Sequence, residues 1–281
     1  MPLSISKAID DFYLERTKRN HFWTQGVDGQ TRLKNLKVGV AGLGGMGSNI
    51  AEIFARLGVG HFNLADNDII EVSNINRQVI ASIASVGEKK LDTSVKEIIN
   101  IDPSITLNKF PEGISAQNAE AFVENMDVVI NEIDVLHIQE QIHLLNAARK
   151  KGIPVYTTLV VGVGIHLYKY SPTSSFTPED FLSPLLNDSS LENLLAVLGH
   201  PLPKYMEDSN LNDFIHEIRT RGGIPIFGAS CYLGQSLLAI RVLHDLGYIR
   251  GGESAPKTPE LPEFLVLDPL TLEFKTATVK I

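Results

Sequence analysis

The chain has 281 residues, enough for one large α/β domain or two small ones. Its 25 lysines and arginines against 33 aspartates and glutamates give a formal net charge of −8, whereas a chain built to grip nucleic acid is usually basic. A hydrophobic fraction of 43% excludes disorder as the main state, and a single cysteine excludes an internal disulfide and a cysteine-built zinc site. No window approaches the roughly 18–20 unbroken apolar residues of a membrane span, so we expect a soluble, cytoplasmic protein.

The beginning of the chain predicts a helical arm followed by a βαβ unit. Residues 1–35 are charged and place apolar side chains at helical spacing. Lys37–Gly42 is a short β-branched run that ends in glycine, Ser48–Gly60 has the apolar period of a helix, and His61–Asp66 is a strand that ends on a carboxylate. Strand, glycine-rich turn, helix and strand in this order indicate a parallel sheet.

The same alternation continues to residue 170. The predicted helices are Gly87–Ile99, Asn118–Glu124 and His137–Lys151, and the predicted strands are Ile105–Phe110, Asp127–Asn131, Ile153–Val161 and Ile165–Tyr170. Strands that alternate with helices predict an α/β, Rossmann-like, doubly wound fold, in which a mostly parallel sheet carries helices on both faces.

The rest of the chain breaks this alternation. Residues 171–223 contain several prolines and a fairly polar helical stretch, which predicts a helical insertion over the sheet. Pro225–Gly247 predicts one long apolar helix, and two strands joined by a turn predict a C-terminal β-hairpin. The simplest division is one domain over residues 1–281, with an arm (1–35), a nucleotide-binding core (36–170), the insertion (171–223) and the apolar helix with the last strands (224–281).

A glycine loop separates the first strand from its helix. Gly42, Gly44 and Gly47 fit the pattern G-x-G-x-x-G, which lets the backbone turn tightly and approach a phosphate at a helix N-terminus. Asp66, at the end of the next strand, is placed to bind ribose hydroxyls. Such a loop can also be a plain turn, and the pattern does not identify the nucleotide, for which NAD is the default.

The segment after Asp66 favours a polyphosphate over NAD. It reads DNDIIEVSNINRQ, and Arg77 within it and Lys90 beyond it would supply cations to phosphate oxygens. A guanidinium grips such oxygens as a fork, and a lysine acts as a movable point charge. Either residue alone could be a solvated surface residue, but their joint presence beside a nucleotide loop predicts a polyphosphate ligand.

On these motifs the chain resembles the ThiF/MoeB adenylyltransferases, which also supply the adenylation domains of ubiquitin-activating enzymes. The matching stretch runs from Lys34 to about Gly164 and contains GLGGMGS, DNDIIEVSNINRQ, Gly87–Lys90 and the DVVI strand that precedes Asp134. The resemblance implies ATP with Mg²⁺, attack of a substrate carboxylate on the α-phosphate, and release of pyrophosphate.

The resemblance also implies a role for each matching residue. Asp134 stands where the family has the Asp of a C-T-D-N motif and would be the magnesium-associated carboxylate, although an Asp just after a strand is often a helix N-cap. Arg19, or Arg16 as the second choice, would reach the ATP of the opposite subunit of a homodimer. The nucleotide would be held by Gly42, Gly44, Gly45, Gly47 and Ser48 of the loop, by Asp66 at the ribose, and by Asn74, Arg77 and Lys90 at the triphosphate with Gln78 beside them.

The chain departs from the family pattern at its cysteine. The two C-x-x-C pairs that hold zinc in many members are absent, so no zinc is expected, and no cysteine lies in Pro172–Gly223. Cys231 falls in the apolar helix, where a free cysteine is usually a small buried hydrophobe. We therefore expect an external or intramolecular nucleophile, rather than a thioester within the chain, to consume the adenylate.

The expected substrate carries a carboxylate, as at the C-terminus of a ubiquitin-like protein or peptide, or in a small carboxylic acid. A homodimer is expected because the helix Pro225–Gly247 has more apolar surface than one sheet face would hide. Two alternatives remain, an NAD-dependent oxidoreductase built on the same loop and a non-catalytic scaffold of the same fold.

Overall fold

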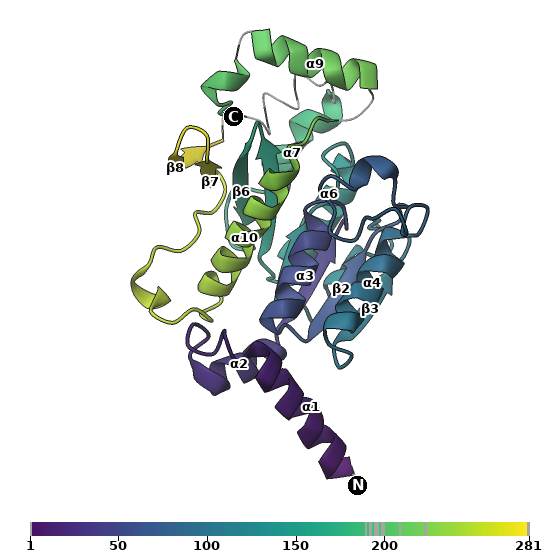
Figure 1. The fold of residues 1–281 in the computed structure, drawn as a ribbon. Coiled ribbons are helices and arrows are strands. Elements are labelled where there is room, and N and C mark those ends of the chain that lie inside the picture. The colour runs from purple at the N-terminus through teal and green to yellow at the C-terminus, as the bar shows by residue number, and fades with distance from the viewer. Residues whose placement is uncertain are drawn as a thin grey trace.

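An eight-stranded sheet runs through the middle of the molecule, in the order β3-β2-β1-β4-β5-β6-β7-β8 (Figure 1). The computed structural model describes residues 2–188, 190, 193, 197, 200–207, 209–221 and 224–279. The strands are β1 (Lys37–Ala41), β2 (His61–Ala65), β3 (Thr106–Phe110), β4 (Val128–Asn131), β5 (Val155–Val161), β6 (Gly164–Tyr170), β7 (Glu263–Asp268) and β8 (Glu273–Thr278).

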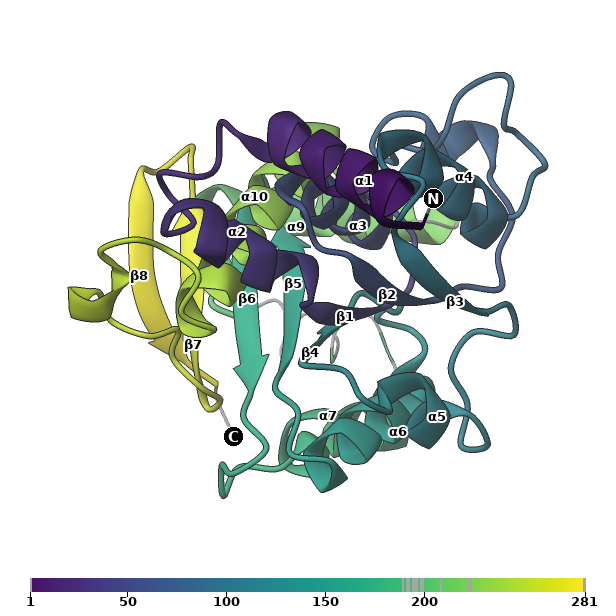
Figure 2. The same cartoon turned by 90° about the horizontal axis from the view of Figure 1, so that it is seen from below.

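Helices cover both faces of the sheet. Figure 2 shows α3, α4 and α10 on one face and α5, α6 and α7 on the other. The α-helices are α1 (Pro2–Thr17), α2 (Gly26–Lys34), α3 (Gly47–Leu57), α4 (Lys90–Ile101), α5 (Ala119–Val123), α6 (Ile138–Lys150), α7 (Pro178–Asn187), α9 (Ser209–Arg221) and α10 (Gly228–Asp245), and the 3-10 helices are η1 (Val72–Asn74), η2 (Lys204–Met206) and η3 (Gly252–Ser254). Within the described residues, no helix is both long and apolar enough to cross a bilayer.

The pairing of the strands confirms the predicted fold class. The strands β3, β2, β1, β4 and β5 pair in parallel, and β6, β7 and β8 continue the sheet in antiparallel pairs. The described part of residues 171–223 is helical, and β7 and β8 form the expected C-terminal hairpin. The boundaries that divide the chain into four parts stay a prediction.

Two helices begin three residues later than the sequence predicts, and hydrogen bonds to the preceding backbone explain both. Before α4, Gly87 donates its N–H to the carbonyl of Ile70, while the N–H of Ile70 donates to Glu88, so these residues pair with a loop instead of joining the helix. Before α10, the carbonyl of Ile226 accepts a hydrogen bond from the side chain of Asn76. Both loops are thereby tied to the segment that follows β2.

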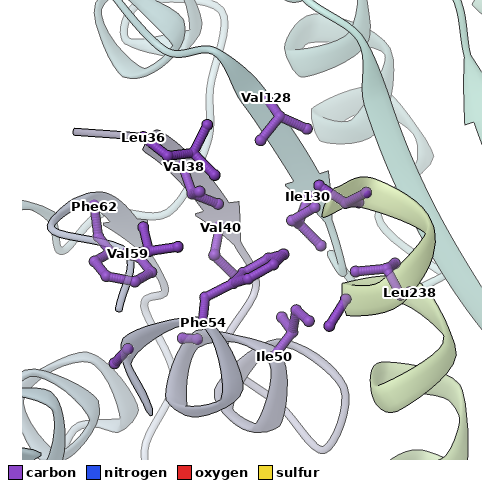
Figure 3. Close-up of a cluster of buried hydrophobic side chains, with 14 of the residues drawn as sticks. Leu36, Val38, Val40, Ile50, Phe54, Val59, Phe62, Val128, Ile130 and Leu238 are labelled. Atoms are coloured by element: carbon purple, nitrogen blue, oxygen red, sulfur yellow. The ribbon is translucent and has the colours of Figure 1, made fainter. Parts of the chain in front are cut away.

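The core between the sheet and α3 fixes the place where the glycine loop stands. Val40 of β1 and Ile130 of β4 point toward Phe54 of α3 and Leu238 of α10 (Figure 3), and all four side chains are fully buried. On the opposite face of β1, Gly39 leaves room for the ring of Phe122, since a Cβ there would lie 3.0 Å from that ring. Close packing on both faces of β1 therefore holds α3, and the loop at its head, in one position.

The long apolar helix α10 is covered mostly by its own chain. Leu238, Val242 and Leu243 are buried, because α10 packs against α3 as well as against β5 and β6. Tyr232 and Ile240 remain 47% and 58% exposed. The prediction of a large uncovered apolar surface was therefore wrong in extent, since it counted only the sheet as cover. The homodimer itself stays a prediction.

The N-terminal arm docks at the end of α3 that lies far from the glycine loop. The hydroxyl of Tyr13 lies 2.8 Å from the carbonyl oxygen of Gln30 and 2.9 Å from that of Gly58, just after α3. The remainder of α1 projects away from the sheet, at the opposite end of the molecule from α9 (Figure 1). Phe12 on this projecting helix is 49% exposed.

Candidate active site

The glycine loop is shaped by the protein itself at two of its glycines. Gly42 has a φ of 84°, in the left-handed region, and a Cβ there would collide with the carbonyl of Glu132. A Cβ at Gly47 would collide with the carbonyl of Gly42. The turn and the entry into α3 thus require glycine at both positions, whatever the loop binds.

Gly44 has a different explanation. A Cβ there would meet no protein atom closer than 3.9 Å, so packing within the described chain gives no reason for glycine. The N–H groups of Gly44, Gly45 and Met46 form no hydrogen bond with any described residue. Free N–H groups at the head of a helix are the ordinary phosphate-binding arrangement, and a glycine lets the ligand approach them.

The Asp66 carboxylate holds the loop against the end of β2. Its two oxygens accept the N–H of Leu43 at 2.6 Å and the N–H of Asp68 at 2.8 Å. Burial raises the pKa of Asp66, and the two backbone hydrogen bonds and nearby Lys90 counter only part of that rise. Each oxygen keeps a lone pair that a ribose hydroxyl could use, so the ribose role stays open to Asp66.

Arg77 lies over the glycine loop. A Cβ at Gly45 would lie 2.8 Å from its Cγ, so glycine allows the side chain to lie flat there. Its Nη1 donates to the carbonyl of Ser73 at 3.0 Å and to Asn76 Oδ1 at 2.8 Å. Among the residues described, Nε and Nη2 have no hydrogen-bond partner, which leaves two donor groups for an anion.

A residue that sequence reasoning missed fixes the position of Arg77. The side chain of Asn49, buried on α3, donates to the carbonyl of Arg77 at 3.2 Å and accepts the N–H of Val79 at 3.0 Å. The available sequence signal was an amide side chain at the third position of this amphipathic helix, directly after the loop.

Gln78 and Asn74 are both buried beside the loop but differ in what they bind. Gln78 is 3% exposed, and its Oε1 has no hydrogen-bond partner in the described chain, which is unusual for a buried acceptor. Asn74 accepts the N–H of Glu71 at 3.1 Å and so closes the short helix η1. Asn74 therefore has a structural role, and its contact with a nucleotide stays a prediction.

Lys90 is paired with a carboxylate that sequence reasoning did not assign. Its Nζ lies 2.7 Å from Asp68 Oδ2, and the side chains of Lys90 and Asp68 are 10% and 65% exposed. Both residues stand at the carboxyl end of β2, near Asp66. The pair keeps the ammonium group next to Asp66, with the Asp68 carboxylate as its counter-charge in the free protein.

The segment after β4 brings Asp134 to the same edge of the sheet. The carbonyl of Glu132 contacts Gly42, so this segment crosses the start of the glycine loop, at the point between β1 and β4 where the strand order reverses. Asp134 is exposed, and its Oδ1 accepts the N–H of Leu136 at 2.9 Å. It does not cap α6, whose N-cap is His137, so the simpler alternative for Asp134 was wrong.

A magnesium ion would find few protein ligands here. Nowhere in the described residues do three His, Cys, Asp or Glu side chains gather as a metal site. One exposed carboxylate such as Asp134 nevertheless suits Mg²⁺, which is usually held by one or two carboxylates together with substrate phosphates and water. Asp134 therefore suits a magnesium ion that is bound mainly by the phosphates of the nucleotide.

Glu132 is a second carboxylate that sequence reasoning missed. Its Oε1 accepts hydrogen bonds from Thr158 Oγ1 at 2.7 Å, from the N–H of Thr158 at 3.2 Å and from Gln235 Nε2 at 3.3 Å. Loss of solvent raises the pKa of Glu132 to about 8, and these hydrogen bonds offset only part of the rise. β4 ends at Asn131, one residue before Glu132. The N–H of Thr158 in β5 therefore donates to the Glu132 side chain instead of to a backbone carbonyl of a neighbouring strand.

Within one chain, Arg19 lies far from the glycine loop and from the residues around it. Its neighbour Asn20 donates to the carbonyl of Leu57 at 3.3 Å, at the C-terminal end of α3. The glycine loop stands at the other end of this 11-residue helix, roughly 16 Å away at 1.5 Å per residue. Arg16 is occupied by Asp102, with an N–O distance of 2.8 Å, whereas exposed Arg19 forms no ion pair with a described residue.

Cys231 is a core residue, as predicted. It is 1% exposed on α10, and burial raises the pKa of its thiol to about 11, which disfavours the nucleophilic thiolate. We expect Cys231→Ala to lower the free energy of unfolding by about 1–2 kcal/mol through the lost packing and to leave ATP binding unchanged. Urea unfolding and calorimetry measure the two effects, and a thioester trapped on Cys231 would contradict this expectation.

A glycine loop at the end of β1, at the head of α3 and beside the reversal of strand order, is the arrangement of a nucleotide-binding α/β protein. Residues 17–278 match the model of the ThiF family, and the chain belongs to that family. The family resemblance stated from the motifs is thereby confirmed.

Curated relatives match parts of the chain. The tRNA threonylcarbamoyladenosine dehydratase of Bacillus subtilis is 35% identical over 135 residues, which are 48% of this chain and 52% of that protein. The probable adenylyltransferase/sulfurtransferase MoeZ of Mycobacterium tuberculosis is 36% identical over 109 residues, which are 39% of this chain and 28% of MoeZ. The chain thus spans about half of the first relative and less of the second.

Solved structures share the fold over different extents. The structure of Escherichia coli MccB with MccA has a TM-score of 0.66 at 20% identity, covering 94% of this chain and 71% of MccB. The E. coli tRNA N6-threonylcarbamoyladenosine dehydratase TcdA in complex with ATP has a TM-score of 0.50 at 27% identity, covering 53% of this chain and 60% of TcdA. The first similarity extends the shared fold to almost the whole chain.

Proposed function

We propose that this protein is an ATP-dependent adenylyltransferase, which activates a substrate carboxylate as an acyl adenylate and releases pyrophosphate. The observation that carries the proposal is the row of N–H groups at Gly44, Gly45 and Met46 without a partner among the described residues, with Asp66 bonded to neighbouring Leu43 and Arg77 lying against Gly45. The similarity to MoeZ, which is described as an adenylyltransferase, and to TcdA, which was solved with ATP, supports it.

The residues suggest how each part of ATP is held. The loop N–H groups bind phosphate oxygens, Asp66 binds the ribose, and Arg77 and Lys90 neutralise the triphosphate. A magnesium ion held at Asp134 would supply further positive charge to the phosphates. No general base is needed, because the attacking carboxylate is already ionised, so positioning and charge stabilisation provide the catalysis.

We also propose a homodimer in which Arg19 completes the site of the partner. Arg19 stands at the far end of α3 from its own loop, so it could serve only a second subunit. Arg16, the second choice, is the weaker candidate, since it is bonded to Asp102. The role of Arg19 would be that of an arginine finger, which brings charge to the transferring group.

The proposal is tested first by nucleotide binding. We expect calorimetry to give tighter binding of ATP·Mg²⁺ than of NAD, because Arg77 and Lys90 complement a triphosphate better than a dinucleotide. Tighter binding of NAD would favour the oxidoreductase instead and remove the basis of the proposal.

Catalysis is tested second, by ATP–pyrophosphate exchange with a panel of carboxylates that contains small acids, peptides and proteins with a free C-terminus. Exchange that depends on one of them is the expected result. Binding of ATP·Mg²⁺ without exchange for any of them would favour the non-catalytic scaffold.

A further inference from the structure

The outer side of α10 presents an uncharged stripe along most of the helix. Its exposed positions recur every three or four residues and therefore lie on one side of the helix. They are Ala229, Tyr232, Ser236 and Ile240. No charged residue occurs between Gly228 and Ile240, and protein interfaces are depleted of charge at their centre and enriched in aromatic residues. The stripe therefore has the composition of a surface that contacts another protein.

The stripe is complementary to itself about Ser236. Tyr232 and Ile240 stand four residues on either side of this serine, which lies near the middle of the 18-residue helix. When two copies of a helix pack in antiparallel across a two-fold axis, residues equally far from the axis meet. Tyr232 would then pack on Ile240 of the partner subunit at two equivalent places, and the small side chain of Ser236 on the axis would let the helices approach closely.

Exposed aromatic side chains stand at both ends of α10. Phe227 directly precedes the helix and is exposed. Beyond the other end, the N–H of Arg250 donates to the carbonyl of Trp23 at 2.8 Å, so the loop after α10 holds a turn of the N-terminal arm. Phe22 and Trp23 in this turn are exposed, and their rings meet edge to face with centroids 5.0 Å apart. Antiparallel packing brings these two rings to Phe227 of the partner subunit, so that one contact covers three exposed aromatic side chains.

The segments at the two ends of α10 carry opposite charges. A Cβ on Gly228, the first residue of α10, would collide with the carbonyl of Asn76, so this end of the helix lies against the segment that follows β2. Residues 66–78 of that segment contain three carboxylates and one arginine, whereas residues 16–25 around the arm turn contain three cationic side chains and no carboxylate. Antiparallel packing sets the basic end of one subunit against the acidic end of the other, and such complementarity fixes the orientation of an interface.

We infer that α10 is the interface with a second copy of the chain, packed in antiparallel against α10 of that copy with Ser236 at the two-fold axis. The inference rests on the proposed function, in which Arg19 has to reach the partner's site. A Cβ on Gly228 would lie 3.7 Å from the Cβ of Arg77, which lies over the glycine loop. The packing therefore sets the arm turn of one subunit, with Arg19 three residues before Phe22, beside the glycine loop of the other.

Cysteine cross-linking tests this arrangement in the full chain, with Cys231→Ala removing the single natural cysteine. Ser236→Cys should give a disulfide-linked dimer on mild oxidation, because closely packed helices bring facing Cα atoms within disulfide reach. Tyr232→Cys and Ile240→Cys should cross-link when the two chains are mixed and far less when each is alone. Gln117→Cys is the matched control, since Gln117 is exposed just before α5 on the opposite face of the sheet (Figure 2), and it should give at least about tenfold less cross-linked dimer than Ser236→Cys.

A charge on the axis provides a second test without oxidation. Ser236→Arg places two like charges next to each other at the centre of the interface, so we expect size-exclusion chromatography with light scattering to show a monomer. Gln117→Arg makes the same change of charge on the opposite face and should remain a dimer. Thermal unfolding of both variants shows that the chains are folded.

The outcomes separate the interface from the reaction. A dimer that survives Ser236→Arg, a wild-type chain that is monomeric, or cross-links that form in Tyr232→Cys alone and Ile240→Cys alone but not in their mixture would each overturn the inference. None of these measurements uses catalysis, so the proposed adenylation is untouched by them. If the cross-links form as expected and no carboxylate supports ATP–pyrophosphate exchange, the proposed adenylation fails and the interface stands.

Discussion

Replacing Arg77 with alanine is expected to raise the Kd of ATP·Mg²⁺ by about 10- to 100-fold. A hydrogen bond to a charged group contributes about 1.5–3 kcal/mol, and Arg77 has two donor groups, Nε and Nη2, without a described partner above the loop. Titration calorimetry at fixed ionic strength measures the change. Arg77→Lys should lie between alanine and arginine, because lysine keeps the charge and loses the fork.

Arg56→Ala is the matched control for this loss. Arg56 stands in the last turn of α3, the helix that follows the loop, but its side chain is 63% exposed and pairs with Glu52 of the same helix. Its removal changes the net charge by the same amount and should leave the affinity for ATP unchanged. Equal losses in the two variants would mean that only the overall charge matters, and an unchanged Kd in Arg77→Ala would remove Arg77 from the site.

Mixing two inactive variants is expected to restore activity. Arg19→Ala removes the arginine that would serve the partner, and Asp134→Asn removes the carboxylate proposed to hold magnesium in its own subunit. A heterodimer of the two variants then has one intact active site. After random mixing of subunits half of the dimers are heterodimers, and each of these has one intact site out of two. The rate of ATP–pyrophosphate exchange should therefore be about a quarter of the wild-type rate. Each variant alone should be nearly inactive.

This experiment uses the carboxylate found in the exchange panel, and size-exclusion chromatography with differently tagged chains shows whether the subunits have exchanged. A mixture that exchanges subunits and stays inactive would mean that Arg19 has no role in the partner's site. Full activity of folded Asp134→Asn alone would exclude Asp134 from catalysis.

The features that the sequence predicted depend on neighbours in the chain. The alternation of apolar strands with helices is a local pattern, and it was enough for the sheet and its helices on both faces. Gly42, Gly44 and Gly47 lie within one turn, and Asp66 directly follows the next strand, so one βαβ unit contains them all. Family membership followed from the same motifs.

The features that the sequence did not predict depend on contacts between distant residues. The partners of Glu132 come from β5, 26 residues later, and from α10, 103 residues later. Their meeting depends on where β4 ends beside β5 and on how α10 packs, which no local pattern determines. The cover of α10 by α3 was missed for the same reason.

The ion pair between Lys90 and Asp68 has a consequence for turnover. In the free protein the ammonium group already has an anionic neighbour, at 2.7 Å, so an incoming nucleotide has to compete with a tethered carboxylate. A triphosphate brings several negative charges to that competition and a monophosphate brings few. For the proposed reaction we therefore expect AMP to be displaced by Asp68 more readily than ATP, so that a side chain of the protein itself would assist the release of AMP.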